Sequence, residues 1–215
     1  NESLWLFNVV NGNIRFGMGA VKGIGKVAVE SLIKERAANG PFLGFVDFCE
    51  RVNLREINKR TIEALIKVGA FDNSDTHNRK TLLENMENII TYAVRVQEEK
   101  ELGQVNLFGG DENSVEMTVD IIEVGDFDEK TKLDYEAELM GIYISGHPLD
   151  QYRAAIEELS SMPIAEVLEI PGSDEREMSL CGLLTDVKEI VTRKGKKMAF
   201  ANLEDLSGKI ECVIF

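Results

Sequence analysis

The feature that most constrains this chain is a glycine-rich stretch at residues 14–36, which joins a short hairpin to a helix. Gly23 and Gly25 lack a Cβ, so we expect the backbone to turn there with positive φ and to admit a bulky group. The amides from Gly23 to Lys26 then open the helix, where unsatisfied N–H groups and the helix dipole favour an anion. Lys22 and Lys26 flank this corner with positive charge. The pattern predicts a phosphate-binding corner, with a purely structural turn between helices as the alternative.

Two other interpretations of these glycines can be tested on the sequence. A P-loop needs Gly at position 20 and Ser or Thr after Gly25-Lys26, but the chain has Ala20 and Val27. Residues 23–28 do fit the dinucleotide-binding pattern G-x-G-x-x-A, which must follow a buried parallel strand. The residues before Gly23 make a poor strand. A P-loop is therefore excluded, and a dinucleotide-binding domain stays as an alternative.

The pattern that fits is the helix-hairpin-helix, a binder of the DNA backbone whose hairpin is typically Gly-hydrophobic-Gly. A second, degenerate copy follows at residues 52–71, with basic residues at the start of its helix. A basic turn near residue 195 adds further positive charge. The candidate DNA-binding residues are Lys22, Gly23, Ile24, Gly25, Lys26, Arg55, Lys59, Arg60, Arg193, Lys194, Lys196 and Lys197.

The charge of the chain favours DNA contact only in its two outer parts. The formal net charge is −14, but residues 1–71 carry 10 Lys/Arg against 7 Asp/Glu, and residues 178–215 carry 6 against 5. Residues 72–177 carry 8 against 26. This central part repels a polyanion and suits protein partners or simple solvation.

Several functional classes are excluded by what the sequence lacks. Cys49, Cys181 and Cys212 are odd in number and have no C-x-x-C spacing, so neither a disulfide framework nor a zinc site is expected. His77 and His147 have no neighbour at ligand spacing. No apolar run reaches the length of a membrane span, and no signal region opens the sequence. We expect a cytoplasmic chain of 215 residues without membrane contact and without a cofactor of its own.

Apolar periodicity predicts a mainly helical first part. Asn11-Gly12 suits a type I′ hairpin turn, and Gly40-Pro41 suits a helix end. Leu83, Met86, Ile90, Ala93 and Val94 mark one face of a long helix. The expected elements are a hairpin at 5–16, helices at 26–38, from 59, at 80–101, 134–144 (capped near Gly146) and 148–159, and at most a short strand at 119–124.

The last segment is strand-like, with strands expected at 178–191, 197–203 and 209–215. They resemble the first three strands of an OB-fold, whose second and third strands contact single-stranded nucleic acid. The fold class is therefore α+β, a helix-hairpin-helix module followed by a partial antiparallel OB-type sheet. Because the strands that would close the barrel are absent, we expect the segment from Met178 to stay poorly ordered or to be completed by strand exchange in a homodimer.

Four blocks of sequence resemble one protein family. Ile-Arg-Phe-Gly-Met-Gly-Ala-Val-Lys-Gly-Ile-Gly at 14–25 and the blocks at 57–72, 141–150 and 200–215 are similar to the alpha subunits of bacterial DNA polymerase III, the C family of replicative polymerases. The resemblance implies an internal fragment of a DNA-directed DNA polymerase, a nucleotidyltransferase of DNA replication. The family's catalytic carboxylates, which hold Mg²⁺, lie in a palm domain that nothing here matches, so this chain alone should be inactive.

The resemblance also implies a division of the chain and its partners. Residues 1–13 would end the preceding domain, 14–102 form the tandem helix-hairpin-helix, 103–110 a clamp-binding loop, 111–177 an acidic linker with helices, and 178–215 the OB strands. Gln104, Val105, Asn106, Leu107 and Phe108 match the clamp motif Q-x-x-[LM]-F. The implied partners are double-stranded and single-stranded DNA, the sliding clamp (beta subunit) and other replicase subunits. A protein-interaction module without DNA binding stays as an alternative.

Overall fold

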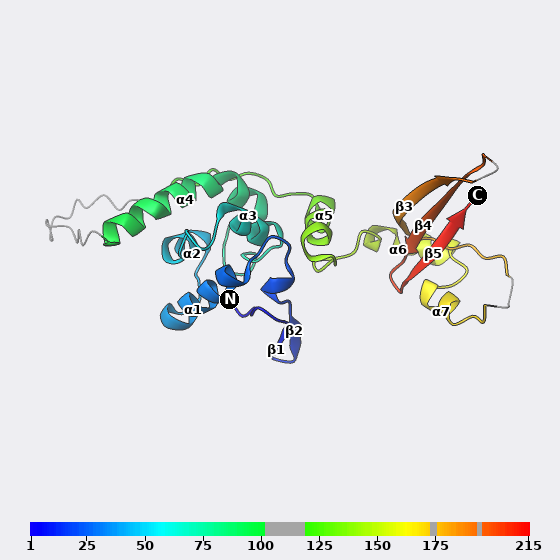
Figure 1. Ribbon diagram of the computed structural model, residues 1–215, viewed down its shortest axis with the longest axis horizontal. Helices are drawn as coiled ribbons and strands as arrows, with labels where there is room; N and C mark the ends of the chain where they lie inside the picture. Colours follow the sequence, from blue (N-terminus) through cyan, green and yellow to red (C-terminus); the bar gives the residue numbers. More distant parts are fainter. Residues whose placement is uncertain (102–118, 173–175, 193–194) are drawn as a thin grey trace. The chain divides into compact units, whose positions relative to one another are not determined.

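The computed structural model describes residues 1–101, 119–172, 176–192 and 195–215. It divides into two compact units, which we call the first unit (Asn1–Tyr143) and the second unit (Ile144–Phe215). The first unit is helical apart from a hairpin, and the second contains a three-stranded antiparallel sheet (Figure 1). The predicted α+β class is confirmed. In the described parts of the chain, no helix is both long and apolar enough to cross a membrane.

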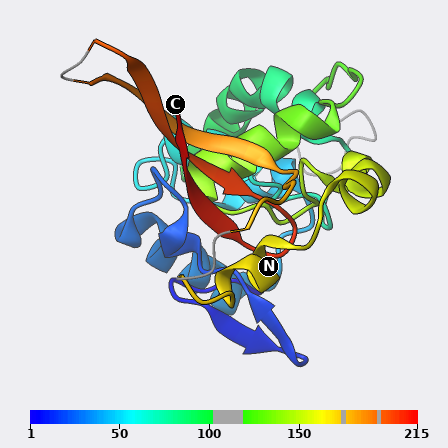
Figure 2. The same cartoon turned by 90° about the vertical axis from the view of Figure 1, so that its right-hand side faces the viewer.

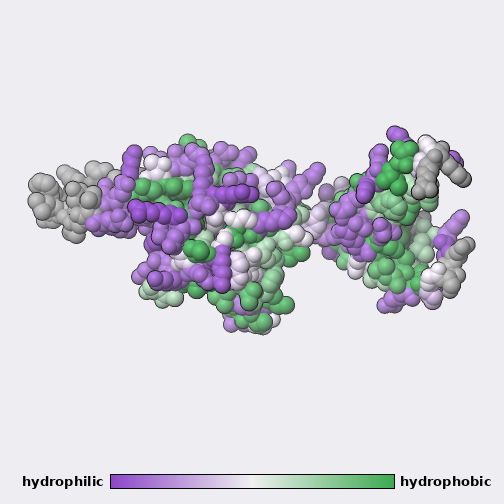
Figure 3. All heavy atoms as spheres, viewed as in Figure 1, coloured by the Kyte–Doolittle hydropathy of each residue, from purple (hydrophilic) through white to green (hydrophobic). Residues whose placement is uncertain are grey.

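The N-terminal hairpin forms as the Asn-Gly pair predicts, although its strands are shorter than expected. Strands β1 (Asn8–Val10) and β2 (Asn13–Arg15) pair antiparallel, with Val9 opposite Ile14. Asn11 and Gly12 have φ values of 51° and 79°, as a type I′ turn requires. The hairpin exposes hydrophobic side chains, Ile14 by 77%, which are visible at the lower edge of the first unit in Figure 3.

The glycines at 17 and 19 are explained by the segment that precedes the hairpin. Residues 4 and 5 cross the 3₁₀ turn η1 (Met18–Ala20), where Met18 N–H donates to the Leu4 carbonyl at 2.8 Å. A Cβ on Gly17 would lie 2.6–2.7 Å from backbone atoms of residues 5–7, and one on Gly19 would lie 2.6 Å from the Trp5 ring. These two glycines therefore permit a close backbone crossing.

Five α-helices in the described residues of the first unit enclose one hydrophobic core. Helix α1 begins at its predicted residue and ends one residue later than expected, before Gly40 with a φ of 83°. The segment between the two corners contains a helix that was not predicted from the sequence, at residues 45–51. Its Phe45 and Phe48 pack edge to face with Phe71, each pair with ring centroids 5.1 Å apart. The helices are α1 (Lys26–Asn39), α2 (Phe45–Arg51), α3 (Lys59–Lys67), α4 (Arg79–Glu101) and α5 (Glu129–Met140).

Helix α4 has nearly the predicted bounds but buries a different face. Leu82 and Ile89 are in the core together with Met86 and Ala93, whereas Leu83 and Ile90 are only partly buried and Val94 is exposed. The buried face also carries Thr81 and Asn85, and these polar side chains weaken the apolar signal in the sequence. The predicted buried face of α4 was therefore wrong, because the observed buried face is rotated from it by part of a helical turn.

The expected short strand at 119–124 does not form. The Asn85 side chain instead takes the place of a partner strand, because its Oδ1 accepts from Ile122 N–H and its Nδ2 donates to the Ile122 carbonyl, both at 2.9 Å. The Thr81 hydroxyl likewise donates to the Val124 carbonyl at 3.0 Å and accepts from the Val124 N–H at 3.1 Å. Two side chains on α4 thus hold an extended segment without a β-ladder.

The helix predicted at 134–144 is misplaced. Helix α5 starts at Glu129, because the Asp128 side chain accepts a hydrogen bond from Thr131 N–H at 2.7 Å and caps it. It ends at Met140, because Gly141 adopts a left-handed conformation with a φ of 74°. The expected cap at Gly146 was five residues too late.

The second unit is built on three antiparallel strands in the order β3, β4, β5 (Figure 2). All three predicted strands are confirmed, although the first begins later than expected. The helix expected from Pro148 begins with the 3₁₀ turn η2. Strand register shifts between Thr185 and Lys188, where Asp186 has a φ of 53°. The elements are η2 (Asp150–Tyr152), α6 (Arg153–Leu159), α7 (Ile164–Leu168), β3 (Leu183–Val191), β4 (Lys197–Glu204) and β5 (Lys209–Ile214).

Helix α7 was not predicted, and the turn between β4 and β5 holds its start. The Asp205 carboxylate accepts from the Ile164 N–H at 2.8 Å and from the amides of Ser207 and Gly208. Burial raises the pKa of Asp205, but the Ser207 hydroxyl and these three amides outweigh it and lower the pKa below its usual value. At the end of β5, Phe215 is 95% exposed, and strand exchange through this edge stays a prediction.

Candidate nucleic-acid interface

The two predicted corners have the same construction in the structure. In each, a buried isoleucine lies two residues before the helix, Ile24 before α1 and Ile57 before α3, with exposures of 7% and 1%. The residue between isoleucine and helix is the N-cap, Gly25 in the first corner and Asn58 in the second. The degenerate copy is thus a true structural repeat of the first.

In the first corner the two glycines have different roles. Gly23 has a φ of 87°, whereas Gly25 is extended with a φ of −85°, so the expected positive φ at Gly25 was wrong. The Ile24 N–H donates to the Val21 carbonyl at 3.2 Å and its side chain is buried, so Ile24 supports the corner and does not face solvent. A 3₁₀ turn, and not a buried parallel strand, precedes Gly23. The dinucleotide-binding interpretation was therefore wrong.

The starts of the two helices differ in how they are capped. The Asn58 side chain accepts from Thr61 N–H at 3.0 Å and satisfies one of the amides that open α3. Gly25 has no side chain, so the N-cap residue of α1 leaves the amides at the start of that helix without a cap of this kind. The first corner is therefore the better anion site of the two. The spacing of Asn58 and Thr61 is a local signal for this cap in the sequence.

The two corners lie against each other. Thr61 Oγ1 donates to the Gly23 carbonyl at 3.5 Å, and Arg60 Nε would be 3.7 Å from a Cβ on Gly23. The second repeat therefore brings the exposed Arg60 to the first corner, where Lys22 and Lys26 are also exposed. The arrangement gathers three cations around the uncapped start of α1.

The predicted basic residues differ in their partners. Lys26 forms an exposed ion pair with Glu30 at 3.6 Å, and Lys59 forms one with Glu87 of α4. The hydrogen bond from Lys59 and its positive charge lower the pKa of Glu87. Lys22, Arg55 and Arg60 enter no ion pair within the described residues. Of the sequence-predicted cations in the first unit, these three are thus the ones available to a ligand.

The remaining predicted site residues lie elsewhere. Lys196 and Lys197 are exposed in the hairpin between β3 and β4, where Gly195 has a φ of 75°. Arg193 and Lys194 lie outside the described residues, as do the five residues of the predicted clamp motif, Gln104, Val105, Asn106, Leu107 and Phe108.

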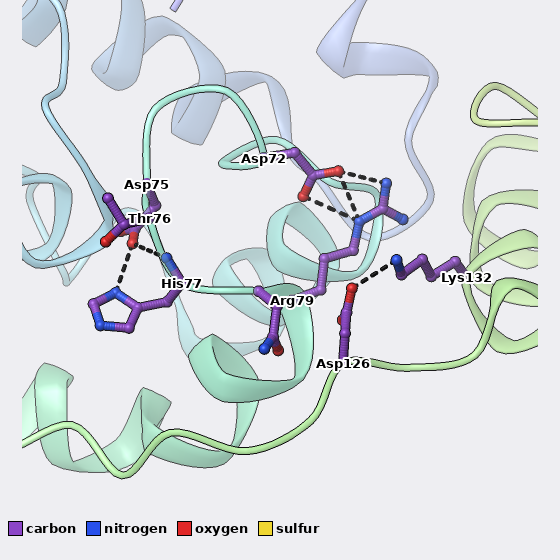
Figure 4. A pocket seen from close by; sticks show the side chains of 8 residues that line it. Asp72, Asp75, Thr76, His77, Arg79, Asp126 and Lys132 are labelled. Carbon is purple, nitrogen blue, oxygen red and sulfur yellow. Dashed lines mark hydrogen bonds and ion pairs between the residues drawn. The ribbon is translucent and has the colours of Figure 1, made fainter.

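A polar cleft of about 300 Å³ lies beside the start of α4 (Figure 4). Its charged groups bond one another, Asp75 with His77 at 2.8 Å and Asp126 with Lys132 at 2.6 Å. Burial raises the pKa of Asp75, but donors from His77 and from the Phe45 amide outweigh it and lower the pKa. This cleft was not predicted from the sequence, and its paired charges indicate a structural role.

Arg79 is the centre of that network. Its side chain is 7% exposed and donates to Asp72 at 2.7 Å, to the buried Glu136 at 3.2 Å and to the Lys67 carbonyl at 3.1 Å. It thereby joins the end of α3, the turn at Asp72, helix α4 and helix α5. One guanidinium thus links four segments of the first unit.

Comparison with known proteins agrees with this geometry. A family model described as a helix-hairpin-helix motif matches residues 1–82. The DNA polymerase III subunit alpha of Borreliella burgdorferi is 36% identical over 218 residues, covering 100% of this chain and 19% of that protein. The corresponding subunits of Thermus aquaticus and Pseudomonas aeruginosa are 36% and 35% identical and also cover 100% of this chain, which spans 17% and 19% of them.

The chain thus spans less than a fifth of the length of these relatives. The matches run through both units, and the helix-hairpin-helix match falls on the two corners described above. By this similarity over its whole length, the chain belongs to the family of DNA polymerase III alpha subunits, of which it represents one segment.

Proposed function

We propose that the first unit is a duplex-binding part of a replicative DNA polymerase, and that it grips the phosphate backbone at the first corner. The observation that carries the proposal is the difference in capping, since the Asn58 side chain caps the start of α3 whereas Gly25, the N-cap of α1, has no side chain to do so. Amides there can donate to a phosphate, and the helix dipole favours its charge.

The side chains around the corner support this proposal. Arg60 and Lys22 are exposed and unpaired among the described residues, and Arg60 lies at Gly23. Contacts of this kind bind phosphates and not base edges, so they position a protein on DNA without reading sequence. A polymerase that moves along its template needs binding of that type.

Replacing Gly25 with valine is expected to weaken binding to every duplex about tenfold, because the new methyl groups would stand where a phosphate approaches. The Gly25 backbone is extended and a Cβ there meets nothing within 4 Å, so the fold tolerates the change. Gly25→Asn would copy the self-capped second corner and should also weaken binding. Fluorescence anisotropy with labelled duplexes of two unrelated sequences measures both effects.

The control for this prediction is Gly125→Val, because Gly125 also has open space around its Cα and lies outside both corners. It should leave DNA affinity unchanged. An unaltered affinity in Gly25→Val, or a loss confined to one sequence, would contradict the assignment of the corner.

We extend the proposal to single-stranded DNA for the second unit. Its three antiparallel strands are similar to the start of an OB-fold, and Lys196 and Lys197 are exposed in the turn between β3 and β4. Lys188 lies opposite Phe200 in the register, which places a cation and an aromatic ring on one face. Aromatic and basic side chains on such a sheet suit stacked bases and their phosphates.

We further propose that residues 104–108 bind a sliding clamp. The support is the pattern Q-x-x-[LM]-F between Gly103 and Gly109, together with relatives that are polymerase III alpha subunits. Leu107 and Phe108 would fill an apolar pocket and Gln104 would fix the register. Burial of two such side chains contributes on the order of 3–6 kcal/mol before ordering costs.

Replacing both Leu107 and Phe108 with alanine is expected to weaken clamp binding by about 100-fold or more. Surface plasmon resonance on the cognate clamp measures the change. The same variant should bind duplex DNA normally, which serves as its control. Unchanged clamp affinity would show that the motif is not the docking segment.

The proposal also makes predictions about polymerase activity and about protein partners. We expect no polymerase activity from this chain alone, since the family's catalytic carboxylates, with their Mg²⁺, lie in a part of such subunits that this sequence does not match. Other replicase subunits are expected partners of the intact protein. A module that binds only proteins is the second candidate, and it predicts no affinity for DNA at any salt concentration.

A further inference from the structure

The first residue of each repeat helix is a lysine, and both lysines are bound to a carboxylate of the same chain. Lys26 pairs with Glu30 one turn along α1, a contact of 3.6 Å. Lys59 pairs with Glu87, which lies 28 residues away and belongs to α4, not to α3 itself. The long-range pair brings an acidic residue to the edge of the basic surface formed by the two corners.

We propose that Glu87 acts as an intramolecular competitor of DNA, a carboxylate that occupies Lys59 in place of a backbone phosphate. The inference rests on the proposed duplex binding of the first unit and deepens it. Lys59 is adjacent to Arg60, whose side chain lies at Gly23, so the Lys59–Glu87 pair stands beside the proposed phosphate site. Glu87 would therefore lower the affinity for DNA by engaging a cation that could otherwise bind a phosphate.

The exposure of the pair allows this exchange of partners. The Lys59 and Glu87 side chains are 56% and 73% exposed, so both stay hydrated and the pair contributes little to stability. The lowered pKa of Glu87 keeps its carboxylate ionised at neutral pH. Lys59 can therefore leave Glu87 for a phosphate at small cost, since the new ion pair replaces the old one.

A purely structural role for the pair is disfavoured by the packing around it. Helices α3 and α4 already meet through the hydrophobic core, which includes Ile66 and Met86. An exposed ion pair adds little to such a contact. The fold therefore does not depend on Glu87, and its removal leaves a folded protein to test.

The test compares the full chain with Glu87→Gln, using a labelled mixed-sequence duplex of about 20 base pairs and titrations at about 50 and about 200 mM NaCl. The variant is expected to bind about three- to tenfold more tightly at the lower salt. One additional phosphate contact also steepens the slope of log K against log salt by about 0.9. Unchanged or weaker binding, with an unchanged slope, would overturn the inference.

Two controls separate competition for Lys59 from a general change of charge. Glu84→Gln makes the same charge change at an exposed position on the same helix and should alter affinity less than twofold. In a Lys59→Met background, Glu87→Gln should no longer tighten binding, because the released cation is absent. Equal gains from Glu84→Gln, or a gain that persists without Lys59, would refute the role of the pair.

The outcome also distinguishes this inference from the proposed function on which it rests. A chain that binds no duplex at either salt concentration overturns the proposed function, and the competition falls with it. If the chain binds duplex with a normal salt dependence and Glu87→Gln leaves its affinity unchanged, the proposed function stands and only the competition is overturned.

Discussion

Replacing Arg79 with methionine is expected to destabilise the first unit by about 3–5 kcal/mol, because the change removes the guanidinium that donates to the buried carboxylate of Glu136. Glu136 is 1% exposed, so solvent cannot replace the lost partner. The Lys67 carbonyl at the end of α3 also loses its donor. Asp72 is less affected, since its side chain is 42% exposed.

Urea unfolding followed by tryptophan fluorescence measures this loss, since Trp5 is the single tryptophan and lies in the first unit. The double variant Arg79→Met with Glu136→Met should recover most of the stability, because two apolar side chains need no charge partner. A loss below about 1 kcal/mol for Arg79→Met, or no recovery in the double variant, would show that the network does not hold the unit together.

The second large effect is expected from Gly17→Ala, with a loss of about 3 kcal/mol in the first unit. The added Cβ would lie within 2.7 Å of three backbone atoms of residues 5–7. Backbone cannot move aside as a side-chain end can, so the N-terminal segment must lift away from η1. The hydrogen bonds of Met18 and Gly19 to residues 4 and 5 would then be lost together.

Gly125→Ala is the matched control, because a Cβ there meets nothing within 4 Å. It should change stability by less than about 0.5 kcal/mol. Hydrogen exchange gives a second measurement, in which Gly17→Ala speeds exchange at Met18 and Gly19. Wild-type stability with wild-type exchange in Gly17→Ala would mean that residues 4–7 do not cross the glycines as described.

Much of the fold could be predicted because local signals were strong. Asn11-Gly12 specified the hairpin turn, and Gly40 specified the end of α1, each through a positive φ that the structure contains. The predicted buried face of α4 was wrong because this face carries polar groups, whose burial is compensated by long-range hydrogen bonds. Asn85 reads as a surface residue in the sequence, yet it is 2% exposed because Ile122, 37 residues away, satisfies it.

The candidate site was predictable in its residues but not in its arrangement. The glycine spacing indicated the first corner, and the second copy of the pattern at residues 52–71 indicated the second corner. The contact of Arg60 with the first corner and the pairing of Lys59 with Glu87 join residues 37 and 28 positions apart, and no local pattern specifies them. Helix starts and caps follow short-range rules, whereas ion pairs between helices depend on how the core sets the helices against each other.

The central claim, that the first unit binds the duplex backbone, is tested most directly by the salt dependence of DNA binding. Contacts with about three phosphates predict a slope of about −2.7 in log K against log salt, which is an affinity loss of roughly 40-fold between about 50 and about 200 mM. We expect that loss for the full chain with any duplex sequence, and a smaller slope for Gly25→Val. A duplex affinity that does not change with salt concentration, or no duplex binding at about 50 mM salt, would contradict the claim.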